Sequence, residues 1–321
     1  MQYTVQRFED FHLHGASAPE WNQRYHQISS GAMSSSLLEV SFGQSHLFRK
    51  SLDRRVVQQG CPPSGQICFA LPARVTAPAR MQGREVSTNS LFVLRGGTEF
   101  TLHRPAGMEL LAITFDSRRF EEFLDASGSC PPRHTLLSNP VLELPTGALL
   151  RFQQVLEDVL AACFDGRELD AQGSAATMLE VSVLGAIAVL LAELPSASHR
   201  PPRATSASFV VEASHRLALS AGGSPISIEE VCQHLRASRR TVQNSFQSVA
   251  QTTPLHYLRS IRLNAVRRQL LSTRGSHAGV GEIATSWGFA HLGHFAAQYK
   301  QLFGESPSAT GRRAERLRRK R

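Results

Sequence analysis

The stretch ISIEEVCQHLRASRRTVQNSF, residues 226–246, decides the fold of the last third of the chain. Ser227 and Glu230 form a capping box, because a hydroxyl and a carboxylate three residues apart satisfy free backbone N–H groups where a helix begins. Apolar residues then recur at helical spacing, at Ile228, Val231, Cys232 and Leu235. Ser238 is a good cap for a second helix after a tight turn. The stretch therefore predicts two short helices joined by a turn, which is a helix-turn-helix unit.

The second helix of this unit presents hydrogen-bonding side chains. Val242, Phe246 and Val249 follow the helical period and are expected to point inward. The residues expected to contact DNA are Ser238, Arg239, Arg240, Thr241, Gln243, Asn244 and Gln247. Arg binds guanine through two hydrogen bonds, and Gln or Asn binds adenine in the same way, at the major-groove edge. We therefore expect this helix to read bases in the major groove.

A second unit follows in VGEIATSWGFAHLGHFAAQYKQLFGESPS, residues 280–308. Its short first helix is expected to end at Gly288, because glycine adopts the left-handed conformation of a helix end. A second reading helix should begin near Leu292, with aromatic residues holding it to the core. Its candidate DNA contacts are His291, Gly293, His294, Ala297 and Gln298. This face is less polar than the first one.

The two units are joined by PLHYLRSIRLNAVRRQLLS, residues 254–272, which predicts one helix beginning at Pro254. One side of this helix is mostly apolar, and arginines are expected to line the other side. Of these arginines, Arg267 and Arg268 are candidate DNA contacts. Two reading helices in successive major grooves of one DNA face lie about 34 Å apart. A rigid connecting helix would fix the two units relative to each other.

Two such units in tandem resemble the DNA-binding domain of the AraC/XylS family of bacterial transcription regulators. The resemblance covers roughly residues 207–310, and GF, then F, then YK and LFGESPS in the second unit are close to the family's signature. The chain departs from the pattern after SPS, where the usual aromatic residue is missing from residues 309–311, and at His291, where Ser or Asp is usual. RRTVQNSF, IRLNAVRRQL and LRGGTEF are further similar to the ethanolamine-operon regulators within the family.

The resemblance implies a sequence-specific transcription regulator that binds double-stranded promoter DNA. Activation is the commoner mode in the resembled family. Its N-terminal domains bind a small effector, mediate dimerisation, or both, and the family's partners would include RNA polymerase and a second copy of the chain. The narrower similarity implies a small amine, sensed with a cobalamin. No effector-binding residue is identified from the sequence, and no bound cofactor is expected.

The charge distribution agrees with a polyanionic partner. Residues 201–321 hold eighteen Lys and Arg, six Glu and no Asp, whereas the whole chain has a net charge of +9. The rest of the chain is therefore net acidic. Basic charge confined to one end is typical of nucleic-acid binding. The last residues, RRAERLRRKR, are expected to be an unstructured basic tail that adds nonspecific attraction to phosphates.

The first two thirds of the chain predict a β-rich domain followed by helices. Short runs of alternating polarity, separated by Pro and Gly, predict strands over residues 35–116. Gly96 and Gly97 predict a tight hairpin. Helical patterns follow residue 117, and the segments 146–164 and 174–194 are expected to pack as an antiparallel pair that forms a dimer contact.

We therefore expect an α+β protein of two domains. A β-rich, cupin-like sensor domain with a helical pair occupies residues 1–194, and a Pro-rich linker occupies residues 195–208. An all-α domain with two helix-turn-helix units occupies residues 209–310, followed by a basic tail at residues 311–321.

Other features argue against membrane insertion and catalysis. The polar N-terminus predicts no secretory signal, and the apolar run at residues 181–192 is shorter than the ~20 residues that span a bilayer. Five cysteines without a CxxC pair suit a reducing compartment, so we expect a cytoplasmic protein. His12 and His14 have the HxH spacing of metal ligands, but no further ligands follow, and no metal is expected.

No catalytic constellation is visible, so an enzyme is not expected. Two alternatives stay open at the level of sequence beside a ligand-responsive regulator. One is a regulator, or a DNA-architectural protein, that acts without a small-molecule effector. An architectural protein would show only a small ratio of specific to nonspecific affinity. The other is a β-barrel dioxygenase with a DNA-binding appendage, which metal analysis would reveal.

Overall fold

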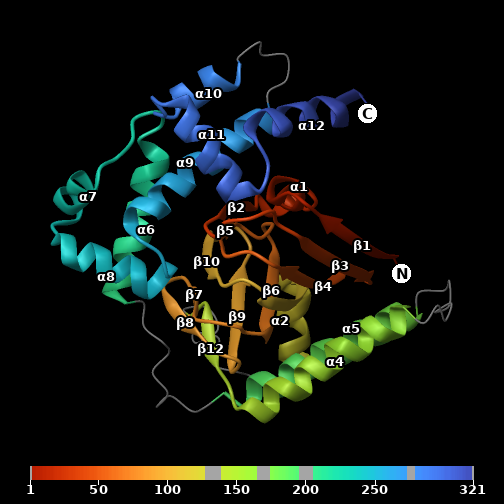
Figure 1. The fold of residues 1–321 in the computed structure, drawn as a ribbon. Coiled ribbons are helices and arrows are strands. Elements are labelled where there is room, and N and C mark those ends of the chain that lie inside the picture. The colour runs from red at the N-terminus through yellow and green to blue at the C-terminus, as the bar shows by residue number, and fades with distance from the viewer. Residues whose placement is uncertain (1, 127–138, 165–173, 195–204, 273–278, 320–321) are drawn as a thin grey trace.

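The computed structural model describes residues 2–126, 139–164, 174–194, 205–272 and 279–319 (Figure 1). An N-terminal domain of two antiparallel β-sheets is joined to a C-terminal helical domain, as the sequence predicts. The molecule is built in four successive layers: a helical pair, the first sheet, the second sheet and the C-terminal helices. Helices α4 (Thr146–Phe164) and α5 (Ser174–Ala192) cover one sheet, the second sheet covers the other face of the first, and the C-terminal helices cover the second sheet.

The first sheet has seven strands in the order β1-β3-β4-β11-β6-β9-β12, and the second has five in the order β2-β5-β10-β7-β8. The strands of the first sheet are β1 (Gln2–Phe8), β3 (Ser35–Phe42), β4 (Ser45–Leu52), β6 (Gln66–Arg74), β9 (Ser90–Arg95), β11 (Glu109–Asp116) and β12 (Val141–Glu143). Those of the second are β2 (Arg24–Gln27), β5 (Val56–Gly60), β7 (Ala79–Met81), β8 (Arg84–Val86) and β10 (Phe100–Arg104). The β-rich region predicted over residues 35–116 is confirmed, and β1, β2 and β12 extend it.

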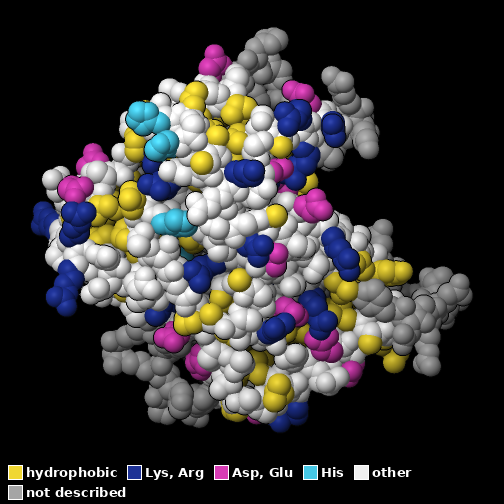
Figure 2. Space-filling model, viewed as in Figure 1, with side chains coloured by type: hydrophobic (Ala, Val, Ile, Leu, Met, Phe, Trp, Pro, Cys, Tyr) yellow, Lys and Arg dark blue, Asp and Glu magenta, His cyan; other side chains and the backbone are white. Residues whose placement is uncertain are grey.

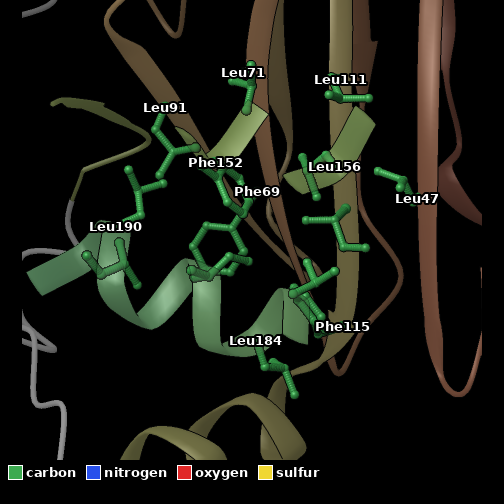
Figure 3. Packing of buried hydrophobic residues seen from close by; sticks show 14 of the residues in the cluster. Leu47, Phe69, Leu71, Leu91, Leu111, Phe115, Phe152, Leu156, Leu184 and Leu190 are labelled. Carbon is green, nitrogen blue, oxygen red and sulfur yellow. The ribbon is translucent and has the colours of Figure 1, made fainter. Parts of the chain in front are cut away.

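Two cores lie on the two faces of the seven-stranded sheet. Phe69 and Leu71 of β6 pack with residues of α4 and α5 such as Phe152 and Leu184 (Figure 3). Cys68 and neighbouring alternate residues face the five-stranded sheet instead. Because successive side chains of a strand point to opposite faces, a strand between two layers is apolar on both. This explains the nearly continuous burial of β6.

Helices α4 and α5 form the predicted antiparallel pair. Arg151 near the start of α4 forms an ion pair with Glu193, just beyond the end of α5. Over Ala175–Ala192, α5 is long and apolar enough to cross a membrane by length and composition alone, and 39% of that segment is buried within the protein. The core helix of a soluble protein passes the same test, so the length and composition of α5 are weak evidence for a membrane span.

The remaining N-terminal helices are short, and the C-terminal domain is all helical. The N-terminal ones are α1 (Phe11–Ala16), a 3-10 turn (Pro19–Trp21) and α2 (Ser117–Ala126). The C-terminal ones are α6 (Ser206–Ser220), α7 (Ile228–Leu235), α8 (Arg239–Ala250), α9 (Pro254–Ser272), α10 (Val280–Ser286), α11 (Leu292–Phe303) and α12 (Pro307–Arg319). Helix α6 therefore begins within the predicted linker at residues 195–208, of which residues 195–204 lie outside the described residues.

The hairpin predicted at Gly96 and Gly97 is wrong. Strand β9 pairs with β6 and β12, whereas β10 pairs with β5 and β7, so the two glycines connect the two sheets. The turn is nevertheless tight, since Gly97 has a φ of +76°. A Cβ at Gly96 would lie 2.3 Å from the carbonyl oxygen of Pro63, so only glycine fits there.

The expectation of an unstructured tail from residue 311 is also wrong. Helix α12 continues to Arg319, Ala314 is buried, and Arg313 forms an ion pair with Asp10 of the N-terminal domain. Basic composition favours a solvated tail, but here tertiary contacts stabilise the helix.

Candidate DNA-binding face

The first helix-turn-helix unit has the predicted caps. Ser227 accepts a hydrogen bond from the backbone N–H of Glu230 at 3.1 Å, and its own N–H donates to the Glu230 carboxylate at 2.7 Å. Arg236 ends α7 with a φ of +48°. Ser238 then begins α8 by accepting from the N–H of Thr241 at 3.1 Å. These caps set the angle at which α8 leaves the turn.

Helix α8 is divided into a buried face and an exposed one. Val242, Phe246 and Val249 are buried, and the Phe246 ring meets Tyr257 of α9 edge-on at 5.0 Å. All seven predicted contact residues of this unit are exposed: Ser238, Arg239, Arg240, Thr241, Gln243, Asn244 and Gln247. Their position is therefore as predicted, while their contact with DNA stays a prediction. Arg239 also lies 3.4 Å from the Glu229 carboxylate, an exposed pair that costs little to break.

The second unit repeats the arrangement with fewer polar groups. Gly288 has a φ of +75° at the end of α10, as predicted. Helix α11 begins after His291, whose side chain makes no capping bond. Of the predicted contact residues, Gln298 is half-buried. The other four are exposed: His291, Gly293, His294 and Ala297.

The two units contact each other directly. A Cβ at Gly223, in the loop before α7, would lie 2.0 Å from the carbonyl oxygen of Ser286 in α10. A Cβ at Gly288 would lie 2.6 Å from the carbonyl oxygen of Gly223. Backbone therefore packs on backbone here, and the contact adds to α9 in fixing the orientation of the units.

The expectation that arginines line an open face of α9 is wrong for Arg267 and Arg268. The Arg267 side chain is 6% exposed and forms ion pairs with Asp10 and Glu305. Arg268 lies 3.1 Å from Nε2 of His26 on β2. Helix α9 is apolar on one side as predicted, but Asn264 and Arg268 of this helix contact β2 of the N-terminal domain. Neither arginine faces an open DNA-binding surface in this arrangement.

Asp10 is the centre of a buried ionic cluster between the domains. Its carboxylate lies 2.7 Å from Arg267 and 2.6 Å from Arg313, and it also accepts a hydrogen bond from the N–H of His12 at 2.8 Å. Burial alone would raise the pKa of Asp10, but the arginines and His12 hold it below its usual value. Asp10, Tyr299 and Glu305 raise the pKa of Arg267 against the effect of its own burial. The cluster therefore stays ionised.

The N-terminal domain also caps the C-terminal ends of both reading helices. Arg55 donates to the carbonyl oxygen of Gln251 at 3.0 Å, at the end of α8. The N–H of Gly31 donates to Leu302 at 3.0 Å, and the Gln27 amide donates to the same carbonyl at 2.6 Å, near the end of α11. The last carbonyls of a helix lack partners within the helix. One domain thus supplies partners to both helices.

A fourth contact aligns α9 with β2. The Asn264 amide donates to the backbone carbonyl of Gln27 at 2.9 Å and accepts from its N–H at 3.0 Å. Sequence reasoning missed Asp10, Gln27, Arg55 and Asn264. Each is a single polar residue whose partner lies far away along the chain, so no local pattern marks it.

The basic side chains agree with a DNA-facing surface. Figure 2 shows Lys and Arg gathered at the edge formed by α7 and α8, and histidines over α10 and the start of α11. Arg236, Arg239 and Arg240 are the exposed arginines of the first unit. Two helix-turn-helix units, each with an exposed reading helix, define a double helix-turn-helix protein.

Comparisons with known proteins place this domain. Residues 231–313 match the family described as "Helix-turn-helix domain". The chain is 43% identical over 84 residues to the probable thc operon regulatory protein of Rhodococcus erythropolis, covering 26% of this chain and 25% of that protein. It is 37% identical over 91 residues to the XylDLEGF operon transcriptional activator of Pseudomonas putida, covering 28% of each. The chain thus spans about a quarter of the length of these relatives.

Among solved structures, a probable AraC family transcriptional regulator from Rhodopseudomonas palustris CGA009 is 32% identical, with a TM-score of 0.31 over 33% of this chain and 97% of that one. The C-terminal region of the chain carries a helix-turn-helix domain, as the sequence motifs predict, and this region is similar to the regulators named above. The relatives it matches are transcription regulators.

Proposed function

We propose that the protein is a sequence-specific DNA-binding regulator of transcription, acting as an activator at a promoter. The two exposed reading helices on one scaffold carry this proposal. The first offers Arg240, Gln243 and Asn244 on an exposed face, which suits direct reading of guanine and adenine. A relative from Pseudomonas putida is named as an operon activator, which supports the same mode.

Selection from a random double-stranded DNA library tests the proposal. The full chain is the right species, because the N-terminal domain covers α9 and caps both reading helices. A selected sequence should bind far more tightly than its scrambled version, by a ratio in the typical range of roughly 10³ to 10⁷. Affinity should fall steeply with salt, since bound cations are released from the phosphates.

Two outcomes would contradict the proposal. Equal affinity for selected and scrambled DNA would favour an architectural protein. A folded chain without salt-dependent DNA binding would exclude DNA as the partner.

We extend the proposal to a small-molecule effector and to a cytoplasmic homodimer that contacts RNA polymerase. The support for an effector is the N-terminal sheet domain, which packs on both helix-turn-helix units. The similarity to ethanolamine-operon regulators favours an effector that carries an amino group. The support for a dimer is the outer surface of α4 and α5, described below.

A further inference from the structure

A cavity lies where the N-terminal domain meets the first helix of the C-terminal domain. Its volume is about 270 Å³. One wall is the outer face of strands β2, β5 and β10, and the other is α6. The side chains central to it are Arg24, Gln59, His103, Glu212, His215 and Arg216.

The sheet wall is built by cross-strand register. Arg24 and Thr101 both lie opposite Gln59, and His26 and His103 both lie opposite Val57. Side chains at these positions share one face of the sheet. The alternate residues of β10, Phe100 and Leu102, belong to the apolar core on the opposite face of this sheet. A row of polar side chains is unexpected in a sheet that is covered on both sides.

The polar groups at the depth of the cavity lack protein partners. His103 and His215 are 5% and 2% exposed, yet both ring nitrogens of His103 and Nε2 of His215 have no hydrogen-bond partner among the described residues. The same holds for Oε1 of Glu212. Buried groups of this kind destabilise a fold unless something hydrogen-bonds to them. Three unsatisfied residues facing one cavity from two domains therefore indicate a binding site.

The chemistry of the lining restricts the ligand. Burial lowers the pKa of His103 to about 4 and that of His215 to about 3, so both rings are neutral and offer donors and acceptors. Nδ1 of His215 is held by the Tyr257 hydroxyl at 2.8 Å. The lining holds two carboxylates, those of Glu99 and Glu212, and two guanidinium groups, those of Arg24 and Arg216. The formal charges of these four groups sum to zero. A ligand without net charge, carrying both an acidic and a basic group, meets this lining best.

We propose that this cavity binds a small zwitterion of amino-acid size, with its ammonium group toward Glu212 and its carboxylate toward Arg24 and Arg216. The inference rests on the proposed function, since it names the class of effector. The volume lies just below the ~300–1,000 Å³ of sites for drug-sized ligands, which suits a smaller molecule.

The position of the cavity gives the ligand a route to DNA binding. Residues of α6 and α8 share one hydrophobic core, in which Val211 packs with Val242 and Phe246. A ligand between the sheet and α6 therefore changes the contacts of the helix that supports the first reading helix. It binds across the contact between the two domains and stabilises their arrangement by mass action.

Thermal unfolding of the full chain with millimolar probes tests the proposal. The probes are the individual proteinogenic amino acids, ethanolamine as an amine without a carboxylate, and acetate as a carboxylate without an amine. At least one amino acid should raise the midpoint by several degrees, and titration should give a saturable curve. Stabilisation by ethanolamine or acetate alone would overturn the zwitterion assignment, and no stabilisation by any probe would overturn the site.

Variants separate binding from structural effects. Glu212→Gln and His103→Phe should each weaken binding of the effective amino acid about tenfold or more, because each removes a hydrogen-bonding group from the ligand. His103→Phe should leave the midpoint without ligand unchanged or higher, since it removes unsatisfied polar atoms. If His103 had a purely structural role, His103→Phe would lower the unfolding midpoint without ligand.

Matched controls are Glu85→Gln and His46→Phe, at exposed positions away from the cavity, which should leave binding unchanged. Unaltered binding in both cavity variants would overturn the proposal. DNA binding measured without any probe keeps the two hypotheses apart. If the chain binds a selected DNA sequence but responds to no probe, this inference fails and the proposed function stands.

Discussion

At the scale of single residues, the first reading helix should carry most of the base specificity. Arg240 and Gln243 are exposed on α8, whereas the predicted polar contacts on α11 are His294 and a half-buried Gln298 between small residues. Arg240→Ala or Gln243→Ala should cost about 1 to 3 kcal/mol of binding free energy at a selected DNA site and relax the preference at one base position. Fluorescence anisotropy with single-base variants of the site measures both effects.

Arg118→Ala is the matched control for these variants. Arg118 is an exposed arginine on α2, in the N-terminal domain, and its substitution should leave affinity unchanged. If Arg240→Ala weakened binding to random and selected DNA by equal factors, Arg240 would contact phosphates and not bases.

Buried histidines should make the fold sensitive to acid. Burial, together with Lys50 and Arg104, lowers the pKa of His14 from 6.5 to about 2. The unfolded chain takes up a proton below pH 6.5 and the folded chain does not, so stability that is present above pH 6.5 is lost as the pH falls. The loss should be about 1.4 kcal/mol per pH unit for such a residue.

His14→Phe should therefore flatten the dependence of the free energy of unfolding on pH between 6.5 and 4, measured by denaturant titration. The aromatic ring suits the site, because Phe8 and Tyr25 lie 4.8 and 5.2 Å from the His14 ring. The exposed control His46→Phe should keep the steep dependence of the original protein. Parallel pH curves for the original protein and His14→Phe would refute the assignment.

At the scale of elements, the ionic cluster around Asp10 should hold α1, α9 and α12 together. Asp10→Asn removes the fully buried carboxylate and leaves Arg267 and Arg313 with the partly exposed Glu305, so it should lower the free energy of unfolding by about 3 to 5 kcal/mol. Asp53→Asn is the control, since Asp53 pairs with Arg54 at the surface and should cost less than about 1 kcal/mol. Denaturant titration that gave equal losses for both would show that the cluster contributes no more than a surface pair.

The elements of the C-terminal domain could be predicted because their signals are local. Caps such as Ser227 and Ser238, glycine at position 288 and a helical period determine α7, α8, α10 and α11 within a few residues of each signal. The environment of Arg267 could not be predicted in this way. Its exposure depends on Asp10, which lies 257 positions away. The hairpin prediction at Gly96 was wrong for the same reason, because the pairing partners of β9 and β10 lie far away along the chain.

At the scale of the whole molecule, α4 and α5 leave an apolar surface uncovered. Leu150, Met178, Val181 and Val189 are 59%, 72%, 47% and 61% exposed. We expect this surface to form the homodimer contact of the proposed regulator, because large exposed apolar groups on neighbouring helices mark interaction sites. A dimer would place two copies of the reading helices on two half-sites.

The double variant Met178→Lys and Val189→Lys should be a monomer by light scattering. Circular dichroism should show that it is still folded. Binding to a two-half-site DNA should weaken, since the second binding event is no longer intramolecular. Leu184 is not suitable for this test, because it is 2% exposed in the core and a charge there would unfold the domain. A double variant that kept the oligomeric state of the original protein would exclude this surface.

Several contacts between the domains, apart from the Asp10 cluster, use backbone atoms on one side. Ser208 donates to the carbonyl of Gly83, and Asn264 bonds the backbone of Gln27. Arg55 likewise donates to the carbonyl of Gln251. Because any amino acid offers the same backbone atoms, one partner in each pair is free to mutate while the other is not. Homologous sequences should therefore show few correlated substitutions at these pairs, and a coevolution search would underestimate how closely the domains are joined.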